Sequence, residues 1–303
     1  GCVGDVVRFS NLLESHVIGD PTFRFAPVPG SVDVDGLLLQ NKVSSWKKLL
    51  KSPLPDVQSL AIEQLRRAGA LSSADLLRIY RESPYGVVRL EALMALSAPP
   101  DNHFITAVTE ASQDAYELVQ RQAIRFIAKN GDRRLIPALI RLSIANNTSD
   151  RCNFNVMTAL ACFPKEDLLA EFDRQFDAPS VQYLDKNNLR GKIRNTIAHS
   201  ADRLTTDIDK VVKGEASEKD RTFTIRALRN TLPHHKVPEL LVYLQNCGDG
   251  NTQILLLEAL GWHTVSCHAA DIAATALKMS EDASLPDAVR QEALKTYRRI
   301  HEK

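Results

Sequence analysis

Apolar residues recur along most of the chain at spacings that place them on one side of an α-helix. The clearest segment, 88–96, has an apolar residue at its first position, a small residue four positions later and a large apolar residue eight positions later. The segments 119–127 and 289–297 repeat this arrangement. Because residues with these spacings share one helix face, each segment is predicted to be a helix that packs on one side.

The same register occurs eight times along the chain, at intervals of 31 to 37 residues. Its first positions are Val57, Val88, Val119, Cys152, Leu189, Asp220, Thr252 and Val289. Eight positions further on, seven of the eight residues are aliphatic. Asp220 and Thr252 are polar at a position that is apolar in the other units. The alignment of these two units could therefore be shifted by one helical turn.

A second amphipathic segment lies between successive repeats, as at 74–80, 135–144, 168–176 and 237–244. Each unit is therefore predicted to be a helix, a turn and a second helix. One such pair cannot bury its apolar face alone, so we expect the pairs to stack. In such a stack each pair contacts its neighbours and the chain has no single centre.

The second-helix pattern V-R-x-x-A-x-x-A-L resembles the HEAT family, and more narrowly the HEAT-like repeats of the phycobilin-lyase type. It is complete at Val88, Arg89, Ala92, Ala95 and Leu96, and partial at Val57, Gln58, Ala61 and Leu65 and at Ala259, Leu260 and Gly261. The resemblance covers about residues 43–303. It implies an all-α fold, a right-handed α-solenoid (superhelix) of about eight HEAT-like helix pairs, and says little about function. The signature positions of tetratricopeptide repeats are not found.

Residues 1–42 do not follow the period. The segment 5–16 is predicted to form a short helix, and Phe23, Phe25 and Val28 are expected to be buried. We interpret residues 1–42 as an irregular N-terminal cap over the exposed apolar face of the first repeat, because terminal units of a stack need capping. A linker from an upstream domain is the alternative. The predicted domains are 1–42 and the repeats at 43–303.

Composition agrees with a helical chain. Of the 303 residues 44% are hydrophobic and 25% charged, whereas aromatic residues are only 6%, with 13 glycines and 14 prolines. Few aromatic, glycine and proline residues favour helix over sheet. The net charge of +1 argues against neutralising many phosphates but leaves a local basic patch open. No stretch approaches the roughly 18 apolar residues that span a bilayer.

The first two residues, Gly1 and Cys2, match the junction of a bacterial lipoprotein. The alternative is an ordinary cysteine after a residue left by a tag. The expected location is therefore either cytoplasmic or membrane-tethered through a preceding N-terminal segment. The five cysteines have no paired spacing, which argues against a disulfide framework. His263, Cys267 and His268 lie close in sequence, but a metal site needs three or four converging ligands, and no metal is expected.

We find no sequence motif of a hydrolase, metalloprotease, P-loop or dinucleotide-binding enzyme. His234 and His235 are interpreted as a loop feature before a helix, so neither an enzyme nor a cofactor is expected. The resemblance leaves two other functions open. Alkylpurine DNA glycosylases bind DNA in a basic groove with tryptophan and aspartate at the chemistry, but here Trp46 and Trp262 are far apart in sequence. Phycobilin lyases need a bilin pocket, which nothing in the sequence specifies.

Two sets of polar residues lie on the second helices. The first set directly follows the first apolar position and comprises Gln58, Arg89, Gln120, Asn153, Arg190, Arg221, Gln253 and Arg290. We interpret it as structural, because family members use arginine here to bridge neighbouring repeats, often with aspartate. The second set is basic and variable, and comprises Arg121, Arg125, Lys129, Lys192, Arg194, Arg226 and Arg229.

Stacked repeats would align the second set into a basic stripe, since residues four apart such as Arg121 and Arg125 share a face. The alternative is a solvated surface balanced by acidic first helices. From the stripe we predict a non-catalytic scaffold or adaptor that binds a protein or peptide of acidic character on the concave face. Nucleic acid is a less favoured partner because of the near-zero net charge.

Overall fold

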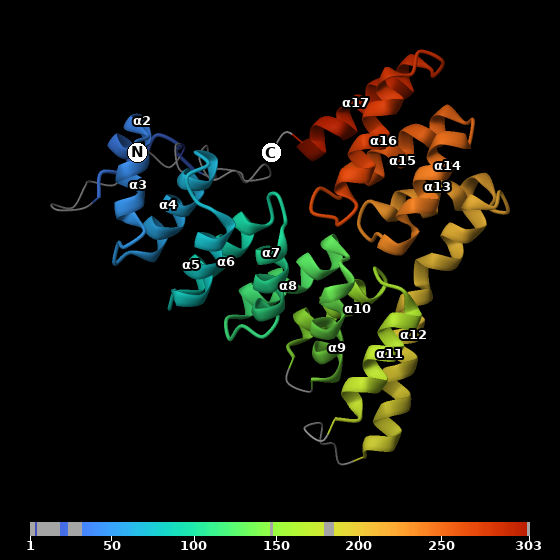
Figure 1. Ribbon diagram of the computed structural model, residues 1–303, viewed down its shortest axis with the longest axis horizontal. Helices are drawn as coiled ribbons and strands as arrows, with labels where there is room; N and C mark the ends of the chain where they lie inside the picture. Colours follow the sequence, from blue (N-terminus) through green and yellow to red (C-terminus); the bar gives the residue numbers. More distant parts are fainter. Residues whose placement is uncertain (1–3, 5–18, 24–31, 146–147, 179–184, 302–303) are drawn as a thin grey trace. The chain divides into compact units, whose positions relative to one another are not determined.

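The computed structural model describes residues 4, 19–23, 32–145, 148–178 and 185–301 (Figure 1). Across these ranges the chain forms sixteen α-helices and two 3-10 helices, with no strand, so the predicted all-α class is confirmed. No helix in these ranges is long and apolar enough to cross a membrane. The chain divides into two compact units between Ser72 and Ser73, and each is described by itself.

The first unit contains α2 (Val34–Gln40), α3 (Val43–Leu49) and α4 (Pro55–Arg67). Trp46, Ala61 and Leu65 are fully buried where α3 packs on α4, and α2 adds Leu37 and Leu38 to the same cluster. The first expected helix pair, α3 and α4, therefore belongs with the N-terminal residues, and α2 covers part of its apolar face.

The expected burial of Phe23 is wrong, because its side chain is 54% exposed. It follows a turn in which Asp20 accepts hydrogen bonds from the backbone and the hydroxyl of Thr22, so the local polar contacts hold the chain at the surface. The predicted helix at 5–16, together with Phe25 and Val28, lies outside the described residues.

The second unit contains thirteen of the described α-helices. They are α5 (Ser73–Glu82), α6 (Gly86–Leu96), α7 (Asn102–Ala111), α8 (Glu117–Asn130), α9 (Ile136–Ile144), α10 (Asp150–Leu160), α11 (Lys165–Phe176), α12 (Lys186–Val212), α13 (Glu218–Leu228), α14 (Val237–Asn246), α15 (Gly250–Gly261), α16 (Ala269–Glu281) and α17 (Asp287–His301). The 3-10 helices Arg133–Leu135 and His234–Lys236 lead into α9 and α14.

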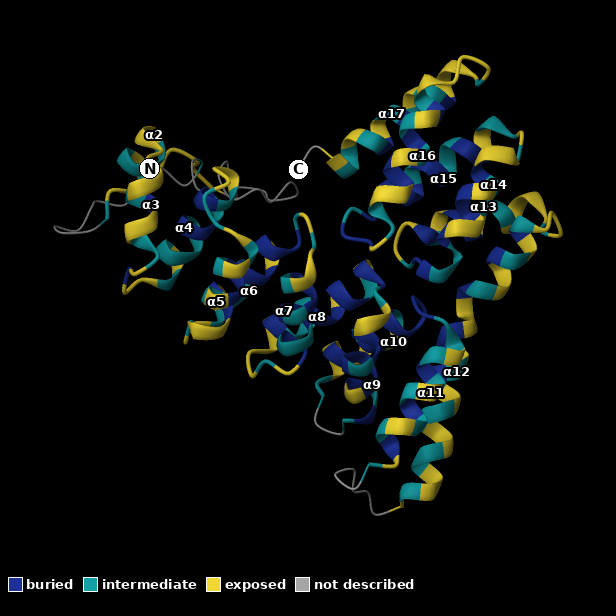
Figure 2. Cartoon of the chain, in the orientation of Figure 1, coloured by how far each residue is buried: buried dark blue, intermediate teal, exposed yellow. Residues whose placement is uncertain are grey.

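All eight predicted repeat registers fall within helices, namely α4, α6, α8, α10, α12, α13, α15 and α17, which we call the second helices. The aliphatic residues eight positions into the register are buried in all seven cases, and Tyr297 in the eighth repeat is partly buried. Buried and exposed residues alternate along the helices of this unit (Figure 2). Burial of Thr224 and Leu228 shows that the register starting at Asp220 needs no shift by a turn.

The second helices of this unit contact one another in chain order, from α6 through α8 and α10 to α12, and from α13 through α15 to α17. The first helices lie in the other layer, where α5 contacts α7, α9 contacts α11 and α14 contacts α16. Each layer contributes one apolar side to the core between them. This arrangement agrees with the predicted helix pairs.

One predicted turn is absent, because α12 is a single helix of 27 residues. Its N-terminal half contacts α10 and α11 as a second helix, and its C-terminal half contacts α13 and α14 as the first helix of the next pair. Between Gly191 and Gly214 the sequence has neither glycine nor proline. Nothing there ends a helix, so two pairs are joined without a turn.

Candidate binding surface

The first polar set on the second helices contacts the loops next to those helices, as expected. Gln58 and Asn153 donate their side-chain amides to backbone carbonyl oxygens in the loop before their own helix, and Gln120 and Gln253 donate theirs to the C-terminal end of the preceding helix. Arg89, Arg190, Arg221 and Arg290 form ion pairs with aspartates. Only Arg89 and Arg221 reach an aspartate of the following repeat, as the interpretation expects, whereas Arg190 and Arg290 pair within their own repeat. We call the whole set the bridging row.

The most buried ion pair of the bridging row joins Arg89 of α6 to Asp114, in the loop before α8. Its two nitrogen–oxygen distances are 2.7 and 2.8 Å, and Tyr80 donates its hydroxyl to the same carboxylate. Burial alone would raise the pKa of Asp114, but the hydrogen bonds from Arg89 and the backbone of Tyr116 lower it. Burial and the nearby carboxylate raise the pKa of Tyr80. The pair thus fixes one repeat against the next.

The opposite side of the second helices is exposed, and we call it the open face. Its residues stand two, three, six or ten positions after the first residue of the register, which places them on one side of the helix. Its members are Met94, Arg121, Arg125, Lys129, Phe154, Thr158, Lys192, Asn195, Phe223, Arg226, Glu258 and Trp262, to which we add Arg229 beside Trp262. Five of the seven basic residues predicted to bind a partner therefore lie at these positions, and Arg229 joins the face through its contact with Trp262.

Arg194 is the exception, and it lies away from the open face. It is five positions into the register, where Leu93, Ile124 and Leu257 are buried between helices. Its guanidinium pairs with Asp173 of α11, at 3.4 Å. Arg194 therefore joins the two layers within its own helix pair and does not extend the basic stripe.

Arg229 is also engaged, within a cluster at the end of α13, α15 and α17. Its guanidinium lies 3.4 Å from Glu258 and 4.7 Å from the ring centroid of Trp262. Arg299 lies 4.8 Å from the same ring, and the indole nitrogen donates to Glu258. Gly261 makes room for this contact, because a Cβ there would lie 2.5 Å from Arg299 Nη1.

The other five cations of the open face, Arg121, Arg125, Lys129, Lys192 and Arg226, form no ion pair with any described residue. Burial, and then the charge of Arg125, lower the pKa of Lys129. Arg121 Nε is shielded from solvent without a hydrogen-bond partner in the described part of the chain. Positive charge therefore accumulates along α8 without neutralisation.

The C-terminal ends of α8, α10, α13 and α15, with the loops that follow them, meet at one place that we call the hub. His234 Nε2 donates to the carbonyl oxygen of Ala128, 106 residues away, at 2.8 Å. Its Nδ1 accepts from Ser266 Oγ at 3.0 Å, and its backbone N–H donates to the carbonyl oxygen of Cys162. Repeats that are not neighbours are thus joined, so the expectation of a stack without a centre is wrong.

Two further contacts close the hub. Asn130 exchanges two hydrogen bonds of 2.8 Å with the loop after α15, donating to the carbonyl of Val265 and accepting from the N–H of Cys267. Gly131 ends α8 with a φ of +72°, and a Cβ there would lie 2.0 Å from Cγ of His234. Only glycine combines this backbone conformation with so close an approach.

The two hub histidines are buried and neutral. Burial lowers the pKa of His234 to about 3 and also lowers the pKa of His263, whose Nε2 donates to the carbonyl oxygen of Leu228. The charge of Lys129 contributes to the shift at His263, which places the basic end of α8 beside the end of α15. The open face therefore reaches the hub.

No group of three or more metal-ligating side chains occurs among the described residues. Ser73, Asp101 and His103 form a hydrogen-bonded cluster, but Ser73 and Asp101 both contact the same Nδ1 of His103. A catalytic triad instead needs the serine and the carboxylate on opposite ring nitrogens. Burial raises the pKa of the Cys162 thiol to about 12 and of the Cys267 thiol to about 11. These thiols are poor nucleophiles at neutral pH.

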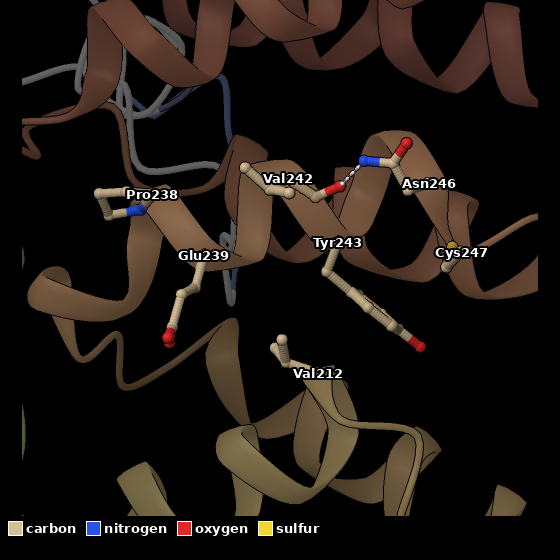
Figure 3. Close-up of a pocket in the computed structure, with 7 residues that line it drawn as sticks. All are labelled: Val212, Pro238, Glu239, Val242, Tyr243, Asn246 and Cys247. Atoms are coloured by element: carbon tan, nitrogen blue, oxygen red, sulfur yellow. Dashed lines mark hydrogen bonds between the residues drawn. The ribbon is translucent and has the colours of Figure 1, made fainter.

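The second unit carries several hollows. A groove of about 580 Å³ lies in the other layer, where Glu239 and Tyr243 of α14 point toward Val212 at the end of α12 and Val242 also lines the groove (Figure 3). A smaller cavity of about 200 Å³ lies between α10 and α12, and Lys192 is among its lining residues. Lys192 places this cavity at the open face, where Phe223 lines a further hollow of about 420 Å³.

Sequence reasoning missed the apolar members of the open face. Phe154 of α10 and Phe223 of α13 are 73% and 74% exposed, and Met94 of α6 is also exposed. The signal was present, because each of these residues lies off the buried stripe of its own repeat. An apolar residue at a position that faces water in the other repeats marks a surface for contact.

The sequence matches no model of a known protein family and shows no significant match to a curated protein.

Proposed function

We propose that the chain is a HEAT-like α-solenoid that acts as a non-catalytic scaffold and binds an acidic protein or peptide segment on the open face. In a stack of this type the second helices line the concave side. The repeat register and the bridging row support the fold, because neighbouring repeats are joined in the way that the HEAT resemblance implies. Scaffolds of this kind supply a long surface and little chemistry.

The observation that carries the proposal is the contrast between paired and unpaired cations. Arginines of the bridging row have carboxylate partners, whereas five cations of the open face have none in the described ranges. Clustered like charges repel one another: burial is the main cause that lowers the pKa of Lys129, and the charge of Arg125 lowers it further. A carboxylate-bearing partner would reduce the repulsion and accept hydrogen bonds from exposed donors such as the guanidinium of Arg125.

The test is binding of fluorescein-labelled poly-glutamate by fluorescence anisotropy at several salt concentrations. We expect binding that weakens with salt and that falls about tenfold or more in Arg125→Glu. Arg141→Glu is the matched control, because Arg141 is an exposed arginine on α9, a first helix that does not carry the open face. Equal binding by the wild-type chain and Arg125→Glu contradicts the proposal.

Nucleic acid is the competing partner, and the same assay separates it. A labelled DNA duplex presents regularly spaced phosphates, so its binding should fall steeply with salt. Glu258 neutralises Arg229 on the same face, so this pair adds no net positive charge for phosphates. We expect weaker binding of the duplex than of poly-glutamate at the same salt concentration.

A further inference from the structure

We infer that the cavity between α10 and α12 receives one bulky apolar side chain of the partner segment, whose acidic residues lie on both sides of that anchor. The inference rests on the proposed function and specifies the chemistry of its partner. Val156, Met157 and Leu160 of α10 and Ile193 and Ile197 of α12 make most of the wall. Lys192 stands at the same opening, on the open face.

The size of the cavity suits one side chain. Its volume is about 200 Å³, and a dry apolar cavity of about 150 Å³ holds a benzene ring. An aromatic or branched aliphatic side chain therefore fits, whereas a packed helix does not.

The cavity exists because α12 packs less closely here than other second helices. In the α12 repeat, Leu189 stands at the first position of the register and Ile193 four positions later. Both residues are only half-buried. The corresponding residues of α8, Val119 and Ala123, are fully buried. Apolar surface left in contact with water is available to a partner, and its burial favours binding in proportion to the area covered.

The surroundings of the cavity are apolar and positively charged. Phe154 lies one turn before Met157 on α10, so the two share a face. Arg121 and Arg125 lie on α8, which packs against α10 on the side away from α12. Lys192 stands at the opening of the cavity. An apolar side chain that enters the cavity therefore has Lys192 on one side and the arginines of α8 on the other.

Helix spacing sets the distances in the partner. Packed helices lie about 8–10 Å apart, so the arginines of α8 are roughly 13 Å from the cavity. An extended chain advances about 3.3 Å per residue, which corresponds to about four residues. The favoured partner is thus an extended segment with an acidic residue beside its apolar anchor and another about four residues away.

A protein segment fits better than a nucleobase. The wall of the cavity is largely aliphatic, and a base placed there would lose hydrogen bonds of its polar edge. Leucine and phenylalanine side chains have no hydrogen bond to lose. A tyrosine side chain has one hydroxyl, which would lie at the open end of the cavity.

The experiment compares three labelled probes on the full chain, namely poly-glutamate, a random copolymer of glutamate and tyrosine, and oligo-dT. We expect the copolymer to bind the wild-type chain about tenfold or more tightly than poly-glutamate, because it adds the burial of an aromatic side chain. Equal affinity for the two polymers overturns the inference and leaves the proposed function standing. Binding of neither polymer overturns both.

A filling variant tests the position of the anchor. Thr196 lines the cavity and is exposed, so Thr196→Trp should fold normally and occupy the space. It should reduce the affinity for the copolymer to that for poly-glutamate and leave poly-glutamate binding unchanged. Val242→Trp is the control, because it fills the groove between α12 and α14 instead. Unchanged copolymer binding in Thr196→Trp, or tighter binding of oligo-dT that Thr196→Trp abolishes, overturns the inference.

Discussion

The hub and the open face belong to the same second helices, but their polar groups differ in one respect. At the hub, His234, His263 and Asn130 are buried. His234 and Asn130 make hydrogen bonds to backbone groups of distant repeats, and His263 donates to the end of the neighbouring α13. On the open face, Arg125, Lys192 and Arg226 are exposed and form no ion pair with a described residue. A polar group with internal partners stabilises the fold, whereas one without them is free to bind something else.

Removing the glycine of the hub should produce the largest effect on stability. Gly131→Ala places a Cβ 2.0 Å from His234 and forces a side chain into a positive φ. We expect a loss of more than about 3 kcal/mol in the free energy of unfolding, measured by urea denaturation. Gly214→Ala has nearly the same φ with no atom within 4 Å, so it should cost only about 1–2 kcal/mol. Equal losses would show that the close approach to His234 does not matter.

Breaking the most buried pair of the bridging row should produce the next largest effect. Arg89→Ala leaves the Asp114 carboxylate, whose side chain is 5% exposed, with only Tyr80 and a backbone N–H as donors. We expect a loss of about 2–3 kcal/mol in the same measurement. Arg78→Ala, which removes an exposed ion pair within α5, should change stability by less than about 0.5 kcal/mol.

Acid should weaken the hub before it affects the open face. The folded pKa of His234 is about 3, below its unfolded value of about 6.5. The stabilisation from the neutral ring is therefore complete above pH 6.5 and is lost as the pH falls towards 3, by up to about 1.4 kcal/mol per unit. His234→Gln should be less stable at pH 7 but should have a smaller slope of stability between pH 6.5 and 4.5. Parallel slopes for the two chains would contradict this role.

Charge reversal on the open face should have the smallest effect on stability. Arg125→Glu breaks no ion pair with any described residue and relieves repulsion with Lys129. We expect the midpoint of urea unfolding to change by no more than the equivalent of about 0.5 kcal/mol, while binding of poly-glutamate falls. A large loss of stability would mean that the open face contributes to the fold, as the hub does.

The repeat register and the bridging row could be predicted from the sequence, because both depend on neighbours that are close in the chain. The period alone placed Val88, Val119 and Val289 on buried faces. The hub could not be predicted in this way. Its contacts join Ala128 to His234 and Asn130 to Val265, and which loops meet depends on small rotations added over several repeats.

The site was only partly predictable for a similar reason. Charge marked Arg125 and Arg226 as surface residues, but charge alone did not separate them from Arg194, whose partner lies on the preceding helix α11. The position in the register separates them, since Arg194 stands where other repeats bury leucine or isoleucine. The cavity beside Lys192 arises from loose packing of α12, which no local pattern reports.

The unbroken helix α12 constrains how the sequence can change over evolutionary time. Turns between helices absorb an inserted or deleted residue by changing their own path. Within α12, one added residue would rotate everything after it by about 100° relative to everything before it, since a helix has 3.6 residues per turn. Repeats on the two sides of α12 are also tied together at the hub. Seven added residues would restore nearly the same orientation, but they would also lengthen the helix by about 10 Å and separate the hub contacts between Ala128 and His234 and between Asn130 and Val265. The length of α12 is therefore fixed as long as the hub is kept.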